Sequence, residues 1–144
     1  MSGLTLKDAK GPEGIRLYAI GDVHGRLDLL QDMHGLIRAD IDRNPTHDWR
    51  IIHLGDYIDR GPNSKGVMDF LIHASTHDPR ILSLLGNHDD GFLHYLATGT
   101  QPVFLPIMAA VTPHFLMALR LILTTLNQQR AHINILCRRF HTPI

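Results

Sequence analysis

The sequence predicts an α/β protein in which parallel strands alternate with helices. Three observations predict this class: short apolar runs that each end at a glycine, helical spacing of apolar residues after each run, and loop signals between the units. Repeated strand–helix units form parallel sheets, which are expected to carry helices on both faces. The chain has 144 residues, of which 44% are hydrophobic, enough for one packed domain or part of a larger one.

Each predicted element has a local signal. A first helix follows the first strand because apolar residues from Leu29 to Ile41 recur on one helical face. Asn63 or Ser64 can cap a second helix, which Pro79 ends. A third helical stretch runs through Phe92 to Leu96. The strands are predicted at residues 17–20, 51–54 and 81–85.

Composition excludes several classes of protein. The formal net charge of zero argues against a strongly basic nucleic-acid binder, so no nucleic-acid binding is expected. A single cysteine, Cys137, cannot form an internal disulfide or a cysteine-based zinc site. Residues 1–14 form a polar tail without the apolar core of a secretory signal, so a cytoplasmic location is expected.

The zero net charge conceals two unlike parts. The first 99 residues hold all fourteen acidic residues and ten basic ones, a net charge of −4, whereas residues 100–144 carry four arginines and no acid. The last glycine is Gly99. This break divides the chain into the polar tail 1–14, a strand–helix portion 15–99 and an atypical apolar and basic tail 100–144.

Residues 103–126 are mostly apolar and long enough to span a membrane. Pro106, Pro113, His114 and Arg120 interrupt the run, which favours a buried helix over a membrane span. No membrane association is therefore expected.

Candidate metal ligands follow each strand directly. The three motifs are GDVHG at residues 21–25, GDYIDRG at 55–61 and GNHD at 86–89. In an open parallel sheet the carboxyl ends of the strands form the functional edge, so Asp22, Asp56 and Asn87 are predicted to converge there. Asp22 and His24 are two residues apart and can reach one cation, while Val23 points into the core. Strand-end capping is the purely structural alternative.

The donor types indicate the chemistry. One imidazole, two carboxylates and an amide oxygen suit Mn, Fe or Zn. Asp56 can bridge two ions that clamp a phosphate. Arg60 fits phosphate binding through its planar fork. His88 can protonate a leaving oxygen, with its tautomer fixed by Asp59. Arg26 is a weaker candidate for substrate binding.

Together these motifs resemble the calcineurin-like metallophosphoesterase superfamily, specifically its phosphoprotein phosphatase branch. The resemblance covers residues 17–99 and implies the N-terminal half of a β-sandwich flanked by helices. It also implies two divalent metal ions, with Asp22, His24 and Asp56 at the first and Asp56 and Asn87 at the second. It further implies direct attack of a metal-bound hydroxide on a phosphoester.

The resemblance implies two substrate classes, with phosphomonoesters expected first and symmetrical dinucleoside tetraphosphates as the alternative. Asp59-Arg60 resembles bacterial Ser/Thr protein phosphatases, which implies phosphoserine, phosphothreonine or other phosphomonoesters. Leu85 before GNHD, together with Asp89, is similar to symmetrical bis(5'-nucleosyl)-tetraphosphate hydrolases. The partner is accordingly expected to be a phosphorylated protein or a nucleotide.

The tail departs from the family pattern. The family needs two further histidine ligands downstream, and His114, His132 and His141 lie in no matching motif. This predicts a truncated or frame-shifted C-terminal half, at most one well-held ion and impaired activity. A non-catalytic metal-binding remnant is the alternative of another class.

The remaining residues of note have structural interpretations. His53 is predicted to be a satisfied histidine within a strand, and Tyr57 to serve packing. Five other histidines are predicted to lie at the surface: His34, His47, His73, His77 and His94.

Overall fold

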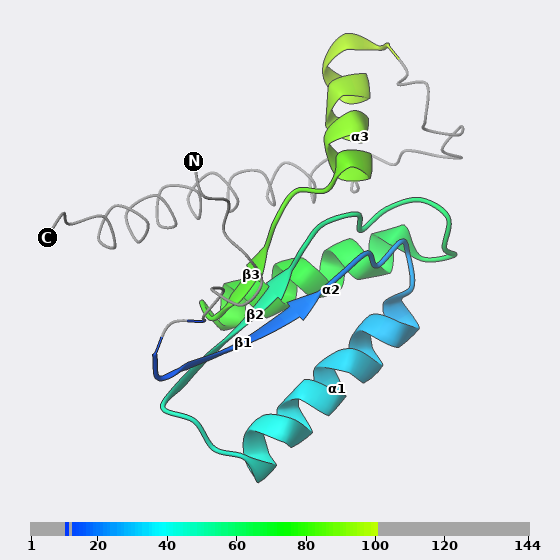
Figure 1. Cartoon of the computed structure of the whole chain (residues 1–144). Helices are drawn as coiled ribbons and strands as arrows, with labels where there is room; N and C mark the ends of the chain where they lie inside the picture. Colours follow the sequence, from blue (N-terminus) through cyan, green and yellow to red (C-terminus); the bar gives the residue numbers. More distant parts are fainter. Residues whose placement is uncertain (1–10, 12, 101–144) are drawn as a thin grey trace, which may run out of the picture.

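The computed structural model describes Gly11 and residues 13–100. Over this range the chain is an α/β unit, as the sequence predicts (Figure 1). The elements in chain order are β1 (Ile15–Ile20), α1 (Leu27–Arg43), β2 (Asp48–His53), α2 (Ser64–His77), β3 (Ile81–Ser83) and α3 (Asn87–Thr98). Most of the polar tail 1–14 and nearly all of the tail 100–144 lie outside the described residues, including His114, His132, Cys137 and His141.

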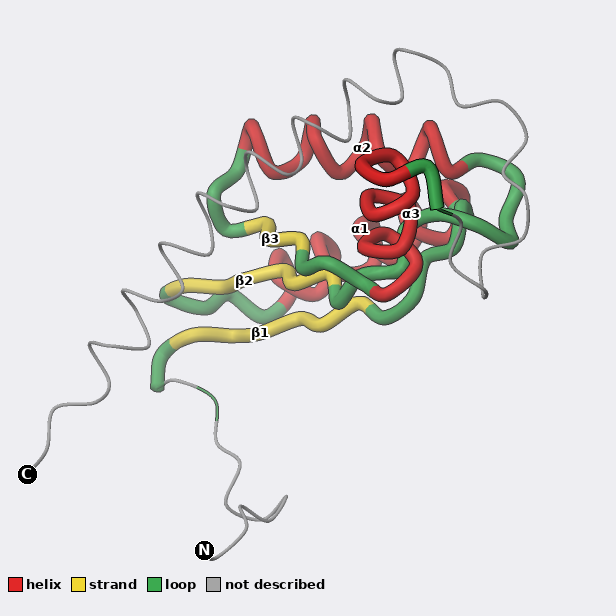
Figure 2. The backbone as a smooth tube through the Cα atoms, turned by 90° about the horizontal axis from the view of Figure 1, so that it is seen from above, coloured by secondary structure: helices red, strands yellow, loops and turns green. Residues whose placement is uncertain are grey.

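The three strands form one parallel sheet in the order β1-β2-β3 (Figure 2). Ile20 is aligned with His53, and His53 is aligned with Ser83, so the three strands end at the same level. The loops that carry the three motifs therefore leave the sheet along one edge, which is the arrangement that the sequence predicts.

Helices α1 and α2 cover the same face of the sheet. Ile51 and Ile81 point toward both helices, since they form one buried cluster with Ile37 of α1 and are packed by Ala74 of α2. On the opposite face Leu17 is 46% exposed. The prediction that helices cover both faces of the sheet is therefore wrong for the described residues. Both crossovers are right-handed and add strands in the same direction, which places both helices on one side.

Only part of the apolar stripe of α1 is buried. Leu30 and Ile37 are buried, and between them lies His34, which is 8% exposed. Leu29, Met33 and Leu36 lie on the adjoining ridge and are 52%, 43% and 63% exposed. The sheet and α2 contact the ridge of positions 30, 34 and 37, because these residues lie one above another on the helix.

His34 and His53 form a buried pair beneath α1. Their Nε2 atoms are 2.9 Å apart, and the rings are stacked with 5.2 Å between centroids. His53 Nδ1 lies 3.0 Å from the carbonyl oxygen of Leu82. His53 is thus a satisfied core histidine, as predicted. The surface placement predicted for His34 is wrong, because this histidine occupies a core-facing position of α1. Since His53 Nδ1 faces a carbonyl, His34 Nε2–H donates the hydrogen bond to His53 Nε2.

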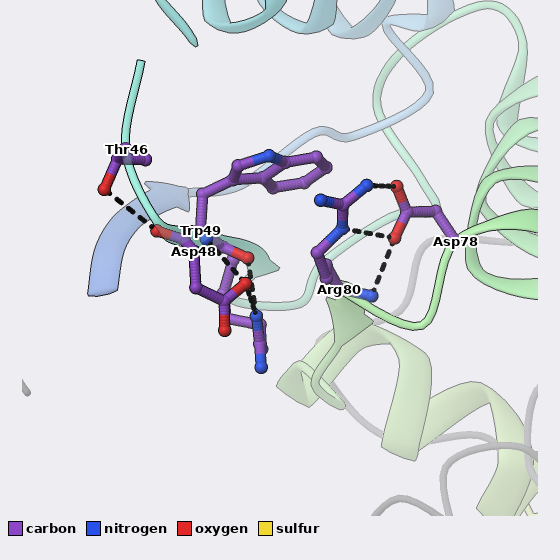
Figure 3. Close-up of polar contacts among 6 residues, drawn as sticks. Thr46, Asp48, Trp49, Asp78 and Arg80 are labelled. Atoms are coloured by element: carbon purple, nitrogen blue, oxygen red, sulfur yellow. Dashed lines mark hydrogen bonds and ion pairs between the residues drawn. The ribbon is translucent and has the colours of Figure 1, made fainter. Parts of the chain in front are cut away.

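Arg80 links the N-terminal ends of β2 and β3. Its guanidinium lies 3.9 Å from the centroid of the Trp49 ring, and it donates hydrogen bonds to Asp78 at 2.8 and 2.9 Å (Figure 3). These contacts join the first residues of β2 to the turn between α2 and β3. β2 accordingly begins at Asp48, earlier than the sequence predicts, whereas β3 already ends at Ser83.

No helix among the described residues is long and apolar enough to cross a membrane. The segment 103–126, which the sequence singles out as a weak membrane candidate, lies outside the described residues.

Candidate metal centre

The first two motif loops are joined through their backbones. The amide nitrogens of Val23 and His24 lie 3.1 and 2.8 Å from the carbonyl oxygen of Asp56. The amide of Gly25 donates to the carbonyl of Tyr57 across 2.9 Å. Val23 is 7% exposed and packs in the core, as the alternation of side chains predicts. These bonds fix the carboxyl ends of β1 and β2 relative to each other.

The third motif is attached to the second by two carboxylates. Asp56 Oδ1 accepts a hydrogen bond from the backbone of His88 across 2.9 Å, at the first turn of α3. Asp89 accepts hydrogen bonds from the amides of Tyr57 and Gly86 at 2.9 and 3.1 Å. A helix N-terminus favours negative charge, so α3 stabilises both carboxylates in place.

Two glycines allow these loops to approach closely. A Cβ atom on Gly61 would collide with the carbonyl oxygen of His24, and one on Gly86 would collide with the backbone of Asp56. Both obstacles are backbone atoms, which cannot move away like the end of a side chain. The spacing between the loops therefore requires glycine at both positions.

Four residues of the motifs have a left-handed backbone although they are not glycine. They are His24, Asp56, Asp59 and Arg60, with φ of 42°, 53°, 67° and 62°. Such conformations cost of order 1 kcal/mol each and persist only where the surrounding structure imposes them. All four coincide with predicted site residues, and they are the only non-glycine positions of this kind in the described part of the chain.

His24 presents an unused nitrogen to the site. Its Nδ1 lies 2.8 Å from the carbonyl oxygen of Ile58, so the N–H at Nδ1 donates and the lone pair is at Nε2. Nε2 is buried and has no hydrogen-bond partner among the described residues. A ligating histidine has this arrangement, with its other nitrogen held by a carbonyl group. The donor set therefore fits a metal ion.

Ligand atoms of His24, Asp56 and His88 lie within 4.8 Å of one another. Asp22, from the same loop as His24, is close as well: its Oδ2 lies 3.6 Å from His24 Nε2, with the side chain 68% exposed. Asn87 is the exposed first residue of α3. The described part of the chain thus brings all four predicted ligands to one edge and adds His88, which the sequence assigns to proton transfer.

His88 is held between a carboxylate and a guanidinium. Its Nδ1 lies 2.8 Å from Asp59 Oδ2, and both side chains are almost completely buried. Arg60 Nη2 lies 3.4 Å from His88 Nε2. The contact between Asp59 and His88 is the one that the sequence predicts. A buried carboxylate at Nδ1 fixes the tautomer of the ring and directs Nε2 toward Arg60.

Arg26 lies beside the centre but is engaged elsewhere. It forms two hydrogen bonds with Asp28, of 2.9 and 2.7 Å, and these contacts lower the pKa of Asp28 to about 2. Arg26 also lines a cavity of about 460 Å³ together with Asp22, His24, Leu29 and Met33.

The sequence profile of one known family, the calcineurin-like phosphoesterases, matches residues 15–129. The chain belongs to this family. The match begins at β1, includes all three motifs and continues beyond Gly99, where the resemblance seen in the motifs ends. An α/β unit with candidate metal ligands at the carboxyl edge of its sheet is thereby assigned to calcineurin-like phosphoesterases.

Several curated relatives are symmetrical bis(5'-nucleosyl)-tetraphosphatases. That of Yersinia enterocolitica is 41% identical over 80 residues, which are 56% of this chain and 24% of the relative. That of Methylococcus capsulatus is 40% identical over 81 residues, 56% and 25% of the two chains. That of Coxiella burnetii is 39% identical over 85 residues, 59% and 26%. The chain spans about a quarter of the length of these relatives.

Among solved structures, one of a proposed diadenosine tetraphosphatase is similar at 26% identity, with a TM-score of 0.41. The similarity covers 58% of this chain and 37% of that one.

Proposed function

We propose that this centre binds divalent metal and supports hydrolysis of phosphoric esters or anhydrides. The observation that carries the proposal is the His24 ring, whose Nδ1 is held by the Ile58 carbonyl while the buried Nε2 has no hydrogen-bond partner in the described part of the chain. A buried polar atom left unsatisfied costs free energy, and a bound cation would remove that cost.

The proposed ligands are those that the family resemblance implies. Asp22, His24 and Asp56 would hold the first ion, and Asp56 and Asn87 would contribute to a second. Mn is the expected metal, with Fe or Zn as alternatives. Since the second set has only two protein ligands, we expect at most one well-held ion in this chain. When bound, the metal supplies positive charge that stabilises phosphoryl oxygens and acidifies water.

The other residues of the centre act on the substrate. Arg60 would bind the equatorial oxygens of the phosphoryl group, which its planar fork matches. As the oxygen of water bonds to phosphorus and the bond to the leaving oxygen breaks, His88 would deliver a proton from Nε2 to that oxygen. Asp59 supports this step because its buried carboxylate, 2.8 Å from Nδ1, stabilises the ring when both nitrogens carry protons.

The substrate class proposed first is a symmetrical dinucleoside tetraphosphate. The relatives named for this activity are 39–41% identical over 80–85 residues. In this chain Leu85 precedes the third motif and Asp89 is its last residue, as the resemblance to these hydrolases implies. Phosphoserine, phosphothreonine and other phosphomonoesters are the second candidate, favoured by Asp59 and Arg60. The cytoplasmic location expected from the sequence is part of the same proposal.

Hydrolysis assays with Mn²⁺ test the proposal on the full chain. Diadenosine tetraphosphate, a phosphoserine peptide and nitrophenyl phosphate would be compared, with Asp56→Asn as the inactive variant. Asp69→Asn is the matched control, since Asp69 is exposed and pairs with Lys65 on α2. Preference for the tetraphosphate supports the first class, and preference for the peptide the second. Lack of turnover on all three would favour a non-catalytic metal-binding remnant.

A further inference from the structure

We propose that His73 and His77 form a second transition-metal site, at the C-terminal end of α2. The two residues are exposed and four positions apart, so they lie one above the other on the same helical face. Their ring centroids are 4.0 Å apart with an interplanar angle of 34°. Two imidazoles at this separation can direct a nitrogen each to one ion.

The tautomer of His77 is already suited to binding a metal. Its Nδ1 lies 2.7 Å from the carbonyl oxygen of His73, so the N–H is at Nδ1 and the lone pair at Nε2. His24 in the candidate centre has the same arrangement, with its Nδ1 held by a backbone carbonyl. A hydrogen bond of this kind orients the ring and increases the basicity of the ligating nitrogen.

The surroundings select the class of ion. His73 and His77 line a cavity of about 310 Å³ together with His34, Arg38 and Asp78. The Asp78 carboxylate is occupied by Arg80, as Figure 3 shows, and His34 Nε2 is occupied by His53. The imidazole nitrogens of His73 and His77 are therefore the atoms that can coordinate an ion here. This favours Zn²⁺ or Cu²⁺ over Mg²⁺ or Ca²⁺, which prefer oxygen ligands.

The pair is separate from the candidate centre. α2 starts near the motif loops, where the amide of Asn63 donates to the carbonyl of Gly25 across 3.0 Å. It ends at His77, beside the turn that leads into β3. Fourteen residues of helix rise about 20 Å, so the two metal sites would lie at opposite ends of the sheet. An ion bound by two residues of the last turns would hold that end of the helix in its folded form.

Copper binding to the full chain tests the proposal. Substoichiometric Cu²⁺ should broaden the NMR signals of residues 73–77 through its paramagnetism. His73→Ala and His77→Ala should each weaken this binding at least tenfold. Both side chains are exposed, so neither change threatens the fold. His47→Ala is the matched control, because His47 is also exposed and has no partner histidine one helical turn away.

Thermal unfolding provides a second measurement. Zn²⁺ should raise the Tm of the chain more than that of His77→Ala, since binding to the folded state stabilises it by mass action. The proposal would be overturned by unbroadened signals at residues 73–77 in the unaltered chain, or by broadening in His73→Ala and His77→Ala as strong as in the unaltered chain. Neither readout depends on phosphoester hydrolysis, so the result is independent of the function proposed for the candidate centre.

Discussion

The carboxylate of Asp89 accepts a hydrogen bond from the backbone N–H of Tyr57 across 2.9 Å. Its other oxygen accepts from the amide of Gly86, and the residue is only 2% exposed. The last residue of the third motif therefore faces away from the candidate centre. It supports the centre by fixing the loop after β2 against the start of α3.

Asp89→Ala should destabilise the fold. The buried amide of Tyr57 and the partly buried amide of Gly86 would lose their acceptor, at about 1–3 kcal/mol for each unsatisfied group. Part of this loss is offset because burial raises the pKa of Asp89, so the native carboxylate is itself costly. We expect a net decrease of about 2–4 kcal/mol in the free energy of unfolding, measured by urea denaturation. Asp90→Ala, at the exposed neighbour, should cost well under 1 kcal/mol.

His24→Asn should weaken metal binding while the loop keeps its shape. Asparagine tolerates the left-handed backbone that His24 adopts at φ 42°, so the change removes the Nε2 donor with little added strain. Calorimetric titration with Mn²⁺ should show at least a tenfold loss of affinity. His94→Asn, at an exposed position of α3, is the control and should bind as the unaltered chain does. Equal affinities in the two variants would remove His24 from the ligand set.

His88→Asn should slow hydrolysis by about 10²–10⁴-fold on substrates with poor leaving groups, the usual contribution of positioned acid catalysis. The loss should be smaller for nitrophenyl phosphate, because nitrophenolate leaves without protonation. Asp59→Asn should show the same trend, since Asp59 acts through the His88 ring. A loss of equal size for good and poor leaving groups would contradict the acid role. This measurement requires turnover by the chain or by an intact relative with these motifs.

The number of bound ions distinguishes a full two-metal centre from a partial one. We expect atomic emission on purified monomer to find at most one tightly bound ion per chain in the presence of Mn²⁺. Asp56→Asn should lower that value further, because Asp56 is assigned to both ion positions. Two tightly bound ions would mean that residues outside the described part of the chain, such as His114, His132 or His141, complete the second position.

The His34–His53 pair should make stability depend on pH. Burial lowers the pKa of His53 from 6.5 to about 4, and it also lowers that of His34. The folded state disfavours the proton, so stability is complete above pH 6.5 and is lost as the pH falls toward 4. His53 alone accounts for about 3 kcal/mol at most.

Denaturation curves between pH 7.5 and 4 check this dependence. His53→Leu should flatten the pH dependence in that window, whereas His47→Leu, at an exposed position, should leave it unchanged. The carboxyl groups of Asp40 and Asp48 also have lowered pKa values. Their contribution to the stability of the fold is lost only as the pH falls below 3.8, outside this window. If the free energy of unfolding of His53→Leu depends on pH as steeply as that of the unaltered chain, other groups cause the effect.

The order and type of the elements could be predicted because each strand is a short apolar run and each helix has apolar spacing. Which face of the sheet the helices cover could not be predicted, because it depends on the direction in which successive crossovers add strands. The burial of His34 was missed for a related reason. A histidine between Leu30 and Ile37 is read as a polar interruption of the stripe unless its partner, His53, is known to lie beneath it.

The convergence of the candidate ligands could be predicted from three short motifs, because local sequence places polar side chains at strand ends. The contact of Asp59 with His88 also followed, from chemical complementarity. The supporting role of Asp89 could not be read from its place in the motif, since its partners are backbone amides that the sequence does not mark. The left-handed backbone at Asp59 and Arg60 gave no sequence signal, because glycine is the residue that normally indicates it.

The left-handed residues bear on how this gene would behave under random mutagenesis. Every aspartate and arginine codon is one base away from a glycine codon. Glycine at 56, 59 or 60 would relax the backbone strain and would be favoured wherever only expression level is selected. Selection for phosphoester hydrolysis should purge the same three changes. The ratio of glycine recovered at these codons in the two selections would report, position by position, which side chains the strained loops exist to present.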